Sequence, residues 1–274
     1  MRLIHTVAEL RGLLHDCRDA SFVPTMGNLH AGHLSLLRRA AANGSPVIAS
    51  IFVNRLQFAP QEDFDRYPRT QSRDCELLAS AGCDIAFAPS EAEMFPEPPG
   101  YRVHPPSSLA DILEGHFRPG FFSGVCTIVL KLFNLVQPRW AVFGKKDYQQ
   151  LLVVRGMAGQ FALPIEIIGA DTVREESGLA MSSRNGYLSD SLRVEAAQLY
   201  GELQRIADAV RKGQRDHQAL ESTARHSLEA RGWAPEYVAI RRRADLGAPT
   251  EGAGLVVVAA AKLDGTRLID NIEI

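Results

Sequence analysis

Short apolar runs alternate with helically spaced apolar positions along the first part of the chain. Residues 20–23 form an apolar run, and apolar positions between residues 34 and 42 recur at helical spacing. Residues 45–54 are almost continuously apolar, which is typical of a strand buried on both faces of a parallel sheet. A helix at residues 72–81 and a strand at residues 84–88 continue the alternation. The pattern predicts successive βαβ units.

The alternation resumes after an interruption. Residues 89–106 are rich in proline and predict a long surface loop with no clear element. Residues 125–136 are so apolar that the helix they predict should be buried. A strand at residues 140–143, a helix that starts near residue 150 and a strand at residues 165–169 follow.

The pattern changes after the last of these strands. Residues 189–212 and 214–231 predict two long amphipathic helices, and residues 237–240 predict a strand. An apolar strand at residues 255–261 then turns back at Asp264-Gly265, which predicts a hairpin. This is an α+β pattern.

These patterns predict a fold of two domains. We expect an α/β, Rossmann-like parallel-sheet domain at residues 1–172 and a smaller C-terminal α+β domain at residues 173–274. A length of 274 residues suits two domains of ordinary size with a well-buried core.

Composition narrows the class of protein. A net charge of −2 gives no strong attraction for a polyanion. We interpret the arginines at residues 241–243 as a solvated strand edge. We therefore expect no nucleic-acid partner. No apolar run approaches the ~20 residues of a membrane span. The four cysteines contain no CxxC pair, which favours a reducing, cytoplasmic location: Cys17, Cys75, Cys83 and Cys126.

The segment PTMGNLHAGH, residues 24–33, lies where a predicted strand turns into a helix. Such a junction directs unpaired backbone N–H groups and the positive end of the helix dipole outward, and Gly27 and Gly32 allow an anion to approach. Neither the Walker pattern nor G-x-G-x-x-G is present. Taken alone, His30 and His33 are better interpreted as surface or capping histidines than as ligand-binding ones. Their spacing argues against zinc.

Polar groups follow three other predicted elements. Gln57 comes after the strand at residues 45–54, where an open α/β sheet binds ligands, although a single glutamine is often only a solvated loop residue. Residues 144–150 contain two lysines that suit phosphate. The alternative is that both lysines are solvated and that Asp147 only caps the helix that follows. Residues 181–186 contain two serines and an arginine, which suit phosphate or form a polar linker.

Seven segments, in order between residues 22 and 271, resemble the pantoate–beta-alanine ligase family. They are PTMGNLHAGH, SIFVN-x-LQF, FDRYPRT, KLFNLVQP, KDYQQL, GLAMSSRNGYL and RLIDN. The first also resembles the HIGH signature of the wider nucleotidyltransferase superfamily, and MSSRN resembles that superfamily's second, KMSKS-like phosphate loop.

The resemblance implies an ATP-dependent ligase of the HIGH nucleotidyltransferase fold. Its substrates are expected to be pantoate, beta-alanine and ATP with Mg²⁺, and its products pantothenate, AMP and pyrophosphate by way of a pantoyl adenylate. It also implies a homodimer, and a C-terminal domain that covers the site. Mg²⁺ would be held mainly by phosphate oxygens and water, so no metal site made only of protein groups is expected.

The resemblance also assigns residues. His30, His33, Lys146 and Arg184 are expected to be catalytic, with His33 the proton donor. The expected ATP-binding residues are Thr25, Met26, Gly27, His30, Gly32, His33, Gly144, Lys145, Lys146, Asp147, Val173, Met181, Ser182, Ser183 and Arg184. Those expected to bind pantoate or beta-alanine are Gln57, Gln150, Met26 and Arg118.

Four residues depart from the family pattern. Lys145 stands where glutamate is common and adds positive charge beside Lys146, and Arg55 stands where proline is common in NPLQF. Phe121 and Ser123 replace histidine and arginine in what we expect to be a loop.

Three other functions are open to such a sequence. A related nucleotidyltransferase could act on another small acid or phosphate, but a phosphorylated substrate would call for Arg or Lys at Gln57 and Gln150. A catalytically silent nucleotide-binding regulator is opposed by the presence of His30, His33 and Lys146. A nucleic-acid-binding module lacks its basic surface.

Overall fold

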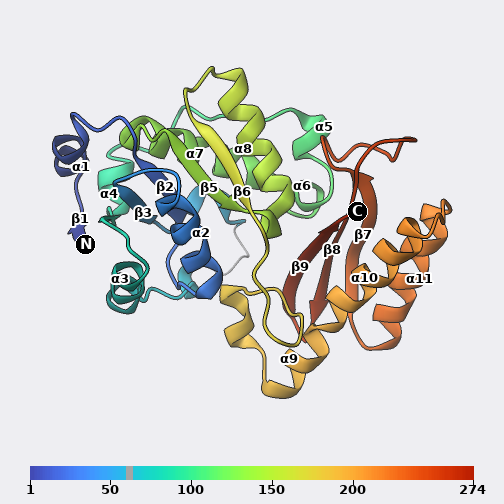
Figure 1. Ribbon diagram of the computed structural model, residues 1–274. Coiled ribbons are helices and arrows are strands. Elements are labelled where there is room, and N and C mark those ends of the chain that lie inside the picture. Colours follow the sequence, from blue (N-terminus) through green and yellow to red (C-terminus); the bar gives the residue numbers. More distant parts are fainter. Residues whose placement is uncertain (60–63) are drawn as a thin grey trace. The chain divides into compact units, whose positions relative to one another are not determined.

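The computed structural model describes residues 1–59 and 64–274 (Figure 1). The chain divides into two compact units. The first unit consists of Met1–Lys145 and Val153–Asp171, and the second of Lys146–Leu152 and Thr172–Ile274. The chain therefore enters the second unit briefly after Lys145 before it returns to the first.

The first unit is built on a six-stranded, wholly parallel sheet with the order β1-β4-β3-β2-β5-β6. Its strands are β1 (Arg2–Ile4), β2 (Ser21–Thr25), β3 (Val47–Ile51), β4 (Ile85–Phe87), β5 (Trp140–Gly144) and β6 (Glu166–Ala170). The α/β, Rossmann-like prediction is confirmed, with every predicted strand of this part present.

Helices follow the strands of the first unit in the predicted βαβ succession. They are α1 (Val7–Leu14), α2 (Ala31–Ala41), α3 (Gln71–Ser80), α4 (Glu91–Met94), α5 (Ser107–Ala110), α6 (Glu114–Phe117) and α7 (Phe121–Val136). Helix α8 (Tyr148–Gln160) begins in the second unit and ends in the first.

Neighbouring residues of each strand point to opposite faces of the sheet, and side chains from helices cover both faces. On one face the ring of Phe133, from α7, lies edge-on to the rings of Phe22 and Phe143, at centroid distances of 6.5 and 6.3 Å. On the other face Val23 and Val142 share a buried cluster with Leu37 of α2. This two-sided burial explains why the central strands are almost continuously apolar.

Several features of the first unit differ from the sequence predictions, among them the short helices α5 and α6, which were not predicted. Strand β1 and helix α1 were not predicted, although Thr6 and Glu9 form a reciprocal capping box at the start of α1. Residues 89–106 were expected to lack any element but contain α4, which Ser90 caps through the N–H of Glu93. Helix α7 begins at Phe121, four residues before the predicted start.

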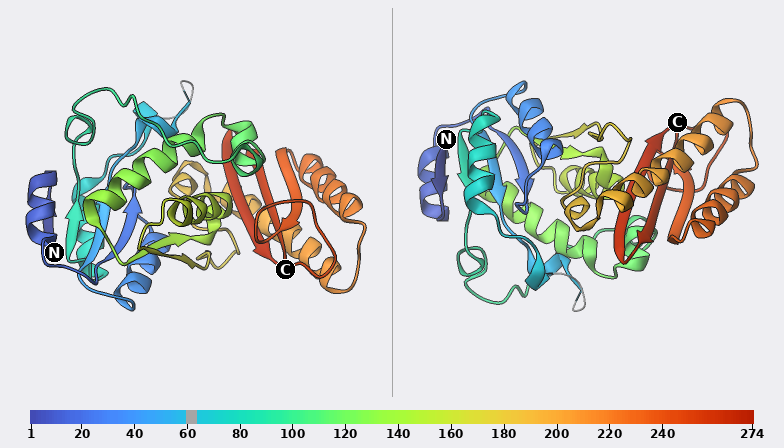
Figure 2. Two further views of the ribbon diagram at one scale, coloured as in Figure 1. Left: turned by 90° about the horizontal axis from the view of Figure 1, so that it is seen from above. Right: turned by 90° about the horizontal axis from the view of Figure 1, so that it is seen from below.

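The second unit is an antiparallel sheet of the order β7-β8-β9 with two helices on one side (Figure 2). Its elements are α9 (Asp190–Ala196), α10 (Gln198–Arg211), α11 (His217–Ala230), β7 (Ala234–Arg242), β8 (Leu255–Leu263) and β9 (Thr266–Glu273). The predicted α+β character and the hairpin at Asp264-Gly265 are confirmed. The predicted helix at residues 189–212 is divided at Ala197.

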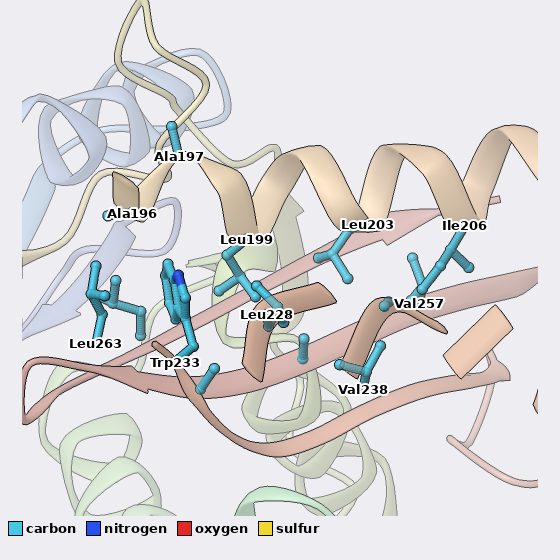
Figure 3. Close-up of a cluster of buried hydrophobic side chains, with 14 of the residues drawn as sticks. Ala196, Ala197, Leu199, Leu203, Ile206, Leu228, Trp233, Val238, Val257 and Leu263 are labelled. Atoms are coloured by element: carbon cyan, nitrogen blue, oxygen red, sulfur yellow. The ribbon is translucent and has the colours of Figure 1, made fainter. Parts of the chain in front are cut away.

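The core of the second unit is a continuous apolar layer between α10, α11 and the sheet (Figure 3). Leu199, Leu203 and Ile206 lie at helical spacing on α10 and pack in one cluster with Val257 of β8. Trp233 is buried at the end of this layer, where its indole N–H donates to Glu195 at 2.9 Å. The polar atom of the indole is therefore satisfied within the core.

Short 3₁₀ turns connect several elements: η1 (Arg55–Gln57), η2 (Phe64–Arg66), η3 (Lys145–Asp147) and η4 (Ser183–Tyr187). Among the described residues, no helix is long and apolar enough to cross a membrane. Strand β7 lies at an edge of its sheet, and the arginine run begins at its end, where Arg242 pairs with Asp245 at 2.8 Å.

The four cysteines are free thiols in two different environments. Burial raises the pKa of Cys83 to about 11 and that of Cys126 to about 12, because a buried thiolate loses its hydration. Cys17 and Cys75 are partly exposed, and burial also raises the pKa of Cys75.

We predict that iodoacetamide at pH 8 alkylates Cys17 first and Cys75 more slowly, and leaves Cys83 and Cys126 unmodified until the protein is unfolded. The reason is that the reactive species is the thiolate, which burial suppresses. Peptide mass spectrometry before and after denaturation measures the four sites separately. Equal labelling of all four in the folded protein would contradict the described core.

Candidate active site

The strand order of the first unit reverses at β2, which lies between β3 and β5. The pairing of β2 with β3 continues to Thr25, opposite Ile51, whereas the recorded pairing with β5 stops at Phe22, opposite Ala141. Open α/β sheets bind ligands outside the carboxyl ends of strands at such a reversal. The turns that follow β2 and β5 therefore occupy the expected position of a ligand site.

The turn after β2 needs an unusual backbone. Gly27 and Asn28 both have positive φ angles, of 83° and 50°. A Cβ atom on Gly27 would lie 3.0 Å from Oδ2 of Asp74 and 3.1 Å from a methyl group of Ile51. Both the conformation and the lack of space favour glycine at this position.

The backbone N–H groups of this turn are bound within the protein. Gly27 donates to the hydroxyl of Thr25 at 3.2 Å, and the carboxylate of Asp74 accepts from Asn28 at 2.9 Å and from Leu29 at 2.8 Å. Our expectation that these donors are unpaired and face an anion is therefore wrong. Asp74, which is 1% exposed on α3, was missed, because its sequence position is that of an ordinary helical acid.

The two histidines cap α2 and each other. His30 is the N-cap residue, and its Nδ1 accepts from the N–H of Gly32 at 3.1 Å. Nδ1 of His33 accepts from the N–H of His30 at 3.4 Å, and the ring centroids are 4.1 Å apart. The capping interpretation of these residues is therefore correct. A neutral imidazole that accepts at Nδ1 carries its proton on Nε2.

Gln57 is held in place after β3. Its Oε1 accepts from the amide of Asn54 at 3.0 Å, and its Nε2 contacts the sulfur of Met26 at 3.1 Å. Asn54 is itself buried and donates to the carbonyl of Gly124 at 3.2 Å. The structure thus brings Met26 and Gln57 together, although they are 31 residues apart, and the solvated-loop interpretation of Gln57 does not hold.

A pocket of about 370 Å³ contains Gln57 and Arg118. Nη2 of Arg118 donates to the backbone carbonyl of Gln57 at 3.2 Å, and its guanidinium lies 3.7 Å from the centre of the Phe121 ring. Phe121 and Ser123 belong to the first turn of α7 and not to a loop as predicted. A Cβ atom on Gly124 would approach the carbonyl of Leu56 to 2.1 Å, so only glycine lets α7 contact η1 this closely.

The segment after β5 places two lysines in different units. Gly144 ends β5, and Lys145 forms an ion pair with Asp171 at 2.8 Å within the first unit. Lys146 belongs to the second unit, where its carbonyl accepts from the amide of Asn271 at 2.9 Å. Asp147 is exposed in η3, and Gln150 is half-buried in the first turn of α8.

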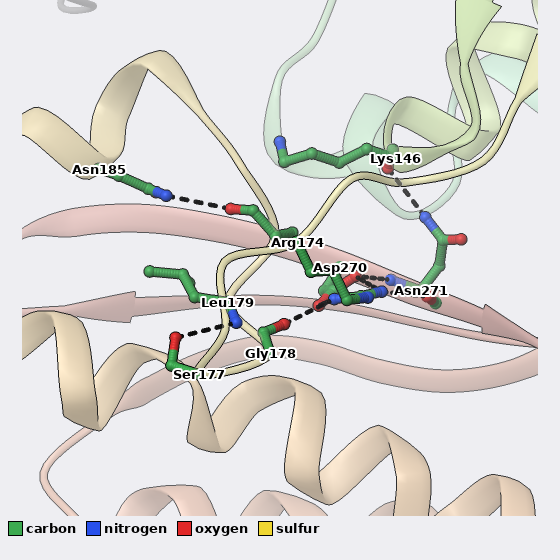
Figure 4. A network of polar contacts seen from close by, with 9 residues as sticks. Lys146, Arg174, Ser177, Gly178, Leu179, Asn185, Asp270 and Asn271 are labelled. Carbon is green, nitrogen blue, oxygen red and sulfur yellow. Dashed lines mark hydrogen bonds and ion pairs between the residues drawn. The ribbon is translucent and has the colours of Figure 1, made fainter. Parts of the chain in front are cut away.

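Residues 173–184 of the second unit fold back on themselves (Figure 4). The N–H of Met181 donates to the carbonyl of Val173 at 2.9 Å, so these two predicted ATP-binding residues lie side by side. Ser182 caps η4 by accepting from the N–H of Arg184 at 3.2 Å. Ser183 and Arg184 follow in the same 3₁₀ turn. The backbone of the predicted phosphate loop is therefore held by this turn and by its cap, Ser182.

Arg55 also has partners. Its guanidinium lies 3.9 Å from the centre of the Phe64 ring, and Nε is 3.3 Å from Oε1 of Glu91.

Within residues 1–59 and 64–274, no three His, Cys, Asp or Glu side chains gather so that they could hold a metal ion.

The comparisons with known proteins agree over nearly the whole chain. The family profile described as pantoate-beta-alanine ligase matches residues 2–273. A crystal structure of pantothenate synthetase from Thermus thermophilus is 45% identical, with a TM-score of 0.95 and coverage of 100% of this chain and 99% of that one. A pantoate-beta-alanine ligase from Francisella tularensis, solved with a βγ-ATP ligand and beta-alanine, is 32% identical, with a TM-score of 0.85 and coverage of 100% and 97%.

The fold and these matches together define an ATP-dependent ligase that forms an amide bond. More narrowly, the chain belongs to the pantoate–beta-alanine ligase family. Its reaction condenses pantoate with beta-alanine through a pantoyl adenylate and releases AMP and pyrophosphate.

We predict that Asp74→Asn lowers the free energy of unfolding by about 2 kcal/mol, because it weakens two charge-assisted hydrogen bonds to buried backbone N–H groups. Chemical denaturation measures the change. Glu76→Gln, at an exposed position of the same helix, is the matched control and should stay within about 0.5 kcal/mol of the wild type. Equal stability of the two variants would show that Asp74 does not support the turn.

Proposed function

We propose that His30 and His33 bind the phosphates of ATP through Nε2 during formation of the adenylate. The observation that carries this proposal is the acceptance of backbone N–H groups by both Nδ1 atoms, which leaves the proton of each neutral ring on Nε2. Both rings also belong to the N-terminal turn of α2, where the helix dipole favours negative charge. The anion is thus bound by side chains and the dipole, since the N–H groups of the preceding turn are occupied.

The first step joins two anions, so its barrier is largely electrostatic. A carboxylate oxygen of pantoate attacks the α-phosphorus of ATP, and the bond from that phosphorus to the pyrophosphate oxygen breaks. Negative charge accumulates on the departing oxygens, where fixed positive groups and N–H donors lower the barrier. In our proposal His33 donates from Nε2 to the departing group, and Lys146 and Arg184 neutralise the phosphates.

The remaining nucleotide contacts are proposed in two groups. Thr25, Gly27 and Gly32 shape the backbone around the histidines, a role supported by the bond of the Thr25 hydroxyl to the Ser50 carbonyl at 2.7 Å. The other proposed nucleotide-binding residues are Met26, Gly144, Lys145, Asp147, Val173, Met181, Ser182 and Ser183. Lys145 already pairs with Asp171, so we expect it to neutralise less of the phosphate charge than Lys146 does.

We propose that Gln57 and Gln150 orient pantoate, with Met26 and Arg118 beside it. Neutral amides can bind its carboxylate and hydroxyls without neutralising the nucleophile. The proposal is supported for Gln57 by the two contacts that hold its amide, to Asn54 and Met26. In the second step the beta-alanine nitrogen attacks the acyl carbon of the adenylate, AMP leaves and the nitrogen loses a proton.

Mg²⁺, a homodimeric state and a cytoplasmic location belong to the same proposal. We propose that Mg²⁺ is carried mainly by the ATP phosphates and water, because this small cation usually keeps several waters and binds substrate phosphates. The four free thiols suit a reducing compartment. Light scattering of the purified protein tests the dimer directly.

We predict that the protein exchanges labelled pyrophosphate into ATP only when pantoate is present, without any need for beta-alanine. The reason is that adenylate formation is reversible and precedes the amine. A filter assay of labelled ATP measures the exchange. Exchange that depends instead on beta-alanine, or none with correctly folded protein, would refute the two-step reaction here.

We predict that His33→Ala reduces pyrophosphate exchange by about 10²-fold or more, because it removes a transition-state donor. The loss of one cap should lower the free energy of unfolding by only about 1 kcal/mol. Arg39→Ala, in the exposed last turn of the same helix, is the control and should keep its exchange activity. Unfolding of the His33 variant would instead assign the residue a purely structural role.

A further inference from the structure

The second unit contains a largely buried ion pair between Arg174 and Asp270. Asp270 of β9 is 4% exposed and binds Arg174 through both carboxylate oxygens, at 2.6 and 2.9 Å. The guanidinium also lies 3.6 Å from the centre of the Tyr200 ring and donates to the carbonyl of Gly178 at 3.1 Å. Figure 4 shows the pairing of Arg174 with Asp270. This bidentate pairing and the stacking on Tyr200 fix the orientation of the arginine.

This ion pair holds the base of the segment of residues 173–184. Arg174 forms a backbone bridge with Ala180, and Glu175 donates its N–H to the carbonyl of Leu179 at 2.8 Å, so the segment closes on itself next to the ion pair. The amide of Asn185 donates to Oε1 of Glu175 at 3.0 Å and to the carbonyl of Ala180 at 3.1 Å. The proposed phosphate loop is therefore anchored at its base and at its end.

The next residue of β9 holds the other proposed phosphate-binding segment of this unit. Asn271 is 6% exposed, and its amide donates to the carbonyl of Lys146 at 2.9 Å. Its own N–H donates to Asp270 at 2.7 Å, and its carbonyl accepts from Arg174 at 3.3 Å. Two adjacent residues of one strand thus bind both segments, and they are bonded to each other.

We propose that Asp270 and Asn271 are positioning residues of the ATP site. They act through Arg174 and the Lys146 backbone, and they set the spacing between Lys146 and the loop that contains Ser182 and Arg184. A strand paired along its length is a more rigid support than a loop, so groups attached to it keep a defined separation. The inference rests on the proposed roles of Lys146 and Arg184 and adds the residues that align them.

A purely structural role of the same residues makes a different prediction. If they only stabilise the unit, their loss lowers the melting temperature and leaves KM values unchanged in the folded enzyme. If they align Lys146 with the loop, KM for ATP rises while KM for beta-alanine stays constant, because ATP alone contacts both segments in our proposal.

The test compares Asn271→Ala with a matched control. Asn271→Ala removes the bond to the Lys146 carbonyl, and we expect KM for ATP and the dissociation constant of a non-hydrolysable ATP analogue to rise about 10-fold, equivalent to about 1.4 kcal/mol. Glu236→Gln breaks ion pairs with Arg267 at 2.7 Å and Lys262 at 3.4 Å in the same sheet, and it should leave both constants within about twofold of wild type.

A second variant covers the case in which Asn271→Ala does not fold. Arg174→Lys keeps a positive charge beside Asp270 but loses the bidentate contact, and we expect it to raise KM for ATP in the same way. Folded variants with unchanged ATP constants would overturn the positioning role and leave the proposed function intact. A wild-type protein that fails to bind the ATP analogue would refute the proposed site, and the positioning role with it.

Discussion

The carboxylate of Asp74 is the interaction on which the rest of the first site depends. It accepts the N–H groups of Asn28 and Leu29, two donors that the left-handed backbone of the turn directs into the protein. This turn leads into His30, the N-cap residue of α2. Nδ1 of each histidine then accepts a hydrogen bond from a backbone N–H group. The buried carboxylate of Asp74 thus supports the turn from which both histidines cap the helix.

The residues that depart from the family pattern each have a partner in this chain. Lys145 pairs with Asp171, Arg55 stacks on Phe64 and pairs with Glu91, and Phe121 lies against the guanidinium of Arg118. Ser123 contacts His104 at 3.4 Å. Each exchanged charge or ring is therefore paired with a neighbouring group of this chain. In this chain the ring of Phe121 provides a cation–π contact that orients Arg118.

Long elements were predictable and short ones were not. The central strands and helices α2, α3 and α7 carry repeated apolar positions, so their periodicity predicts them to within a few residues. Strand β1 has three residues and α4 has four, too few for any period to be recognised. Capping pairs were the local evidence for the two missed helices, Thr6 with Glu9 for α1 and Ser90 with Glu93 for α4. The break at Ala197 keeps helical torsion angles, so no local pattern marks it.

The sequence by itself determined the parallel-sheet fold, the hairpin of β8 and β9 and the resemblance that led to the family, because periodicity and ordered motifs are local properties of the chain. Only the tertiary structure decided which polar groups meet. The bonds of Asp74 to residue 29, of Gln57 to Met26, and of Asn271 to Lys146 join residues 45, 31 and 125 positions apart. Nothing in the neighbouring sequence distinguishes these side chains. An unpaired polar group costs free energy where it is buried, and burial is a property of the folded chain.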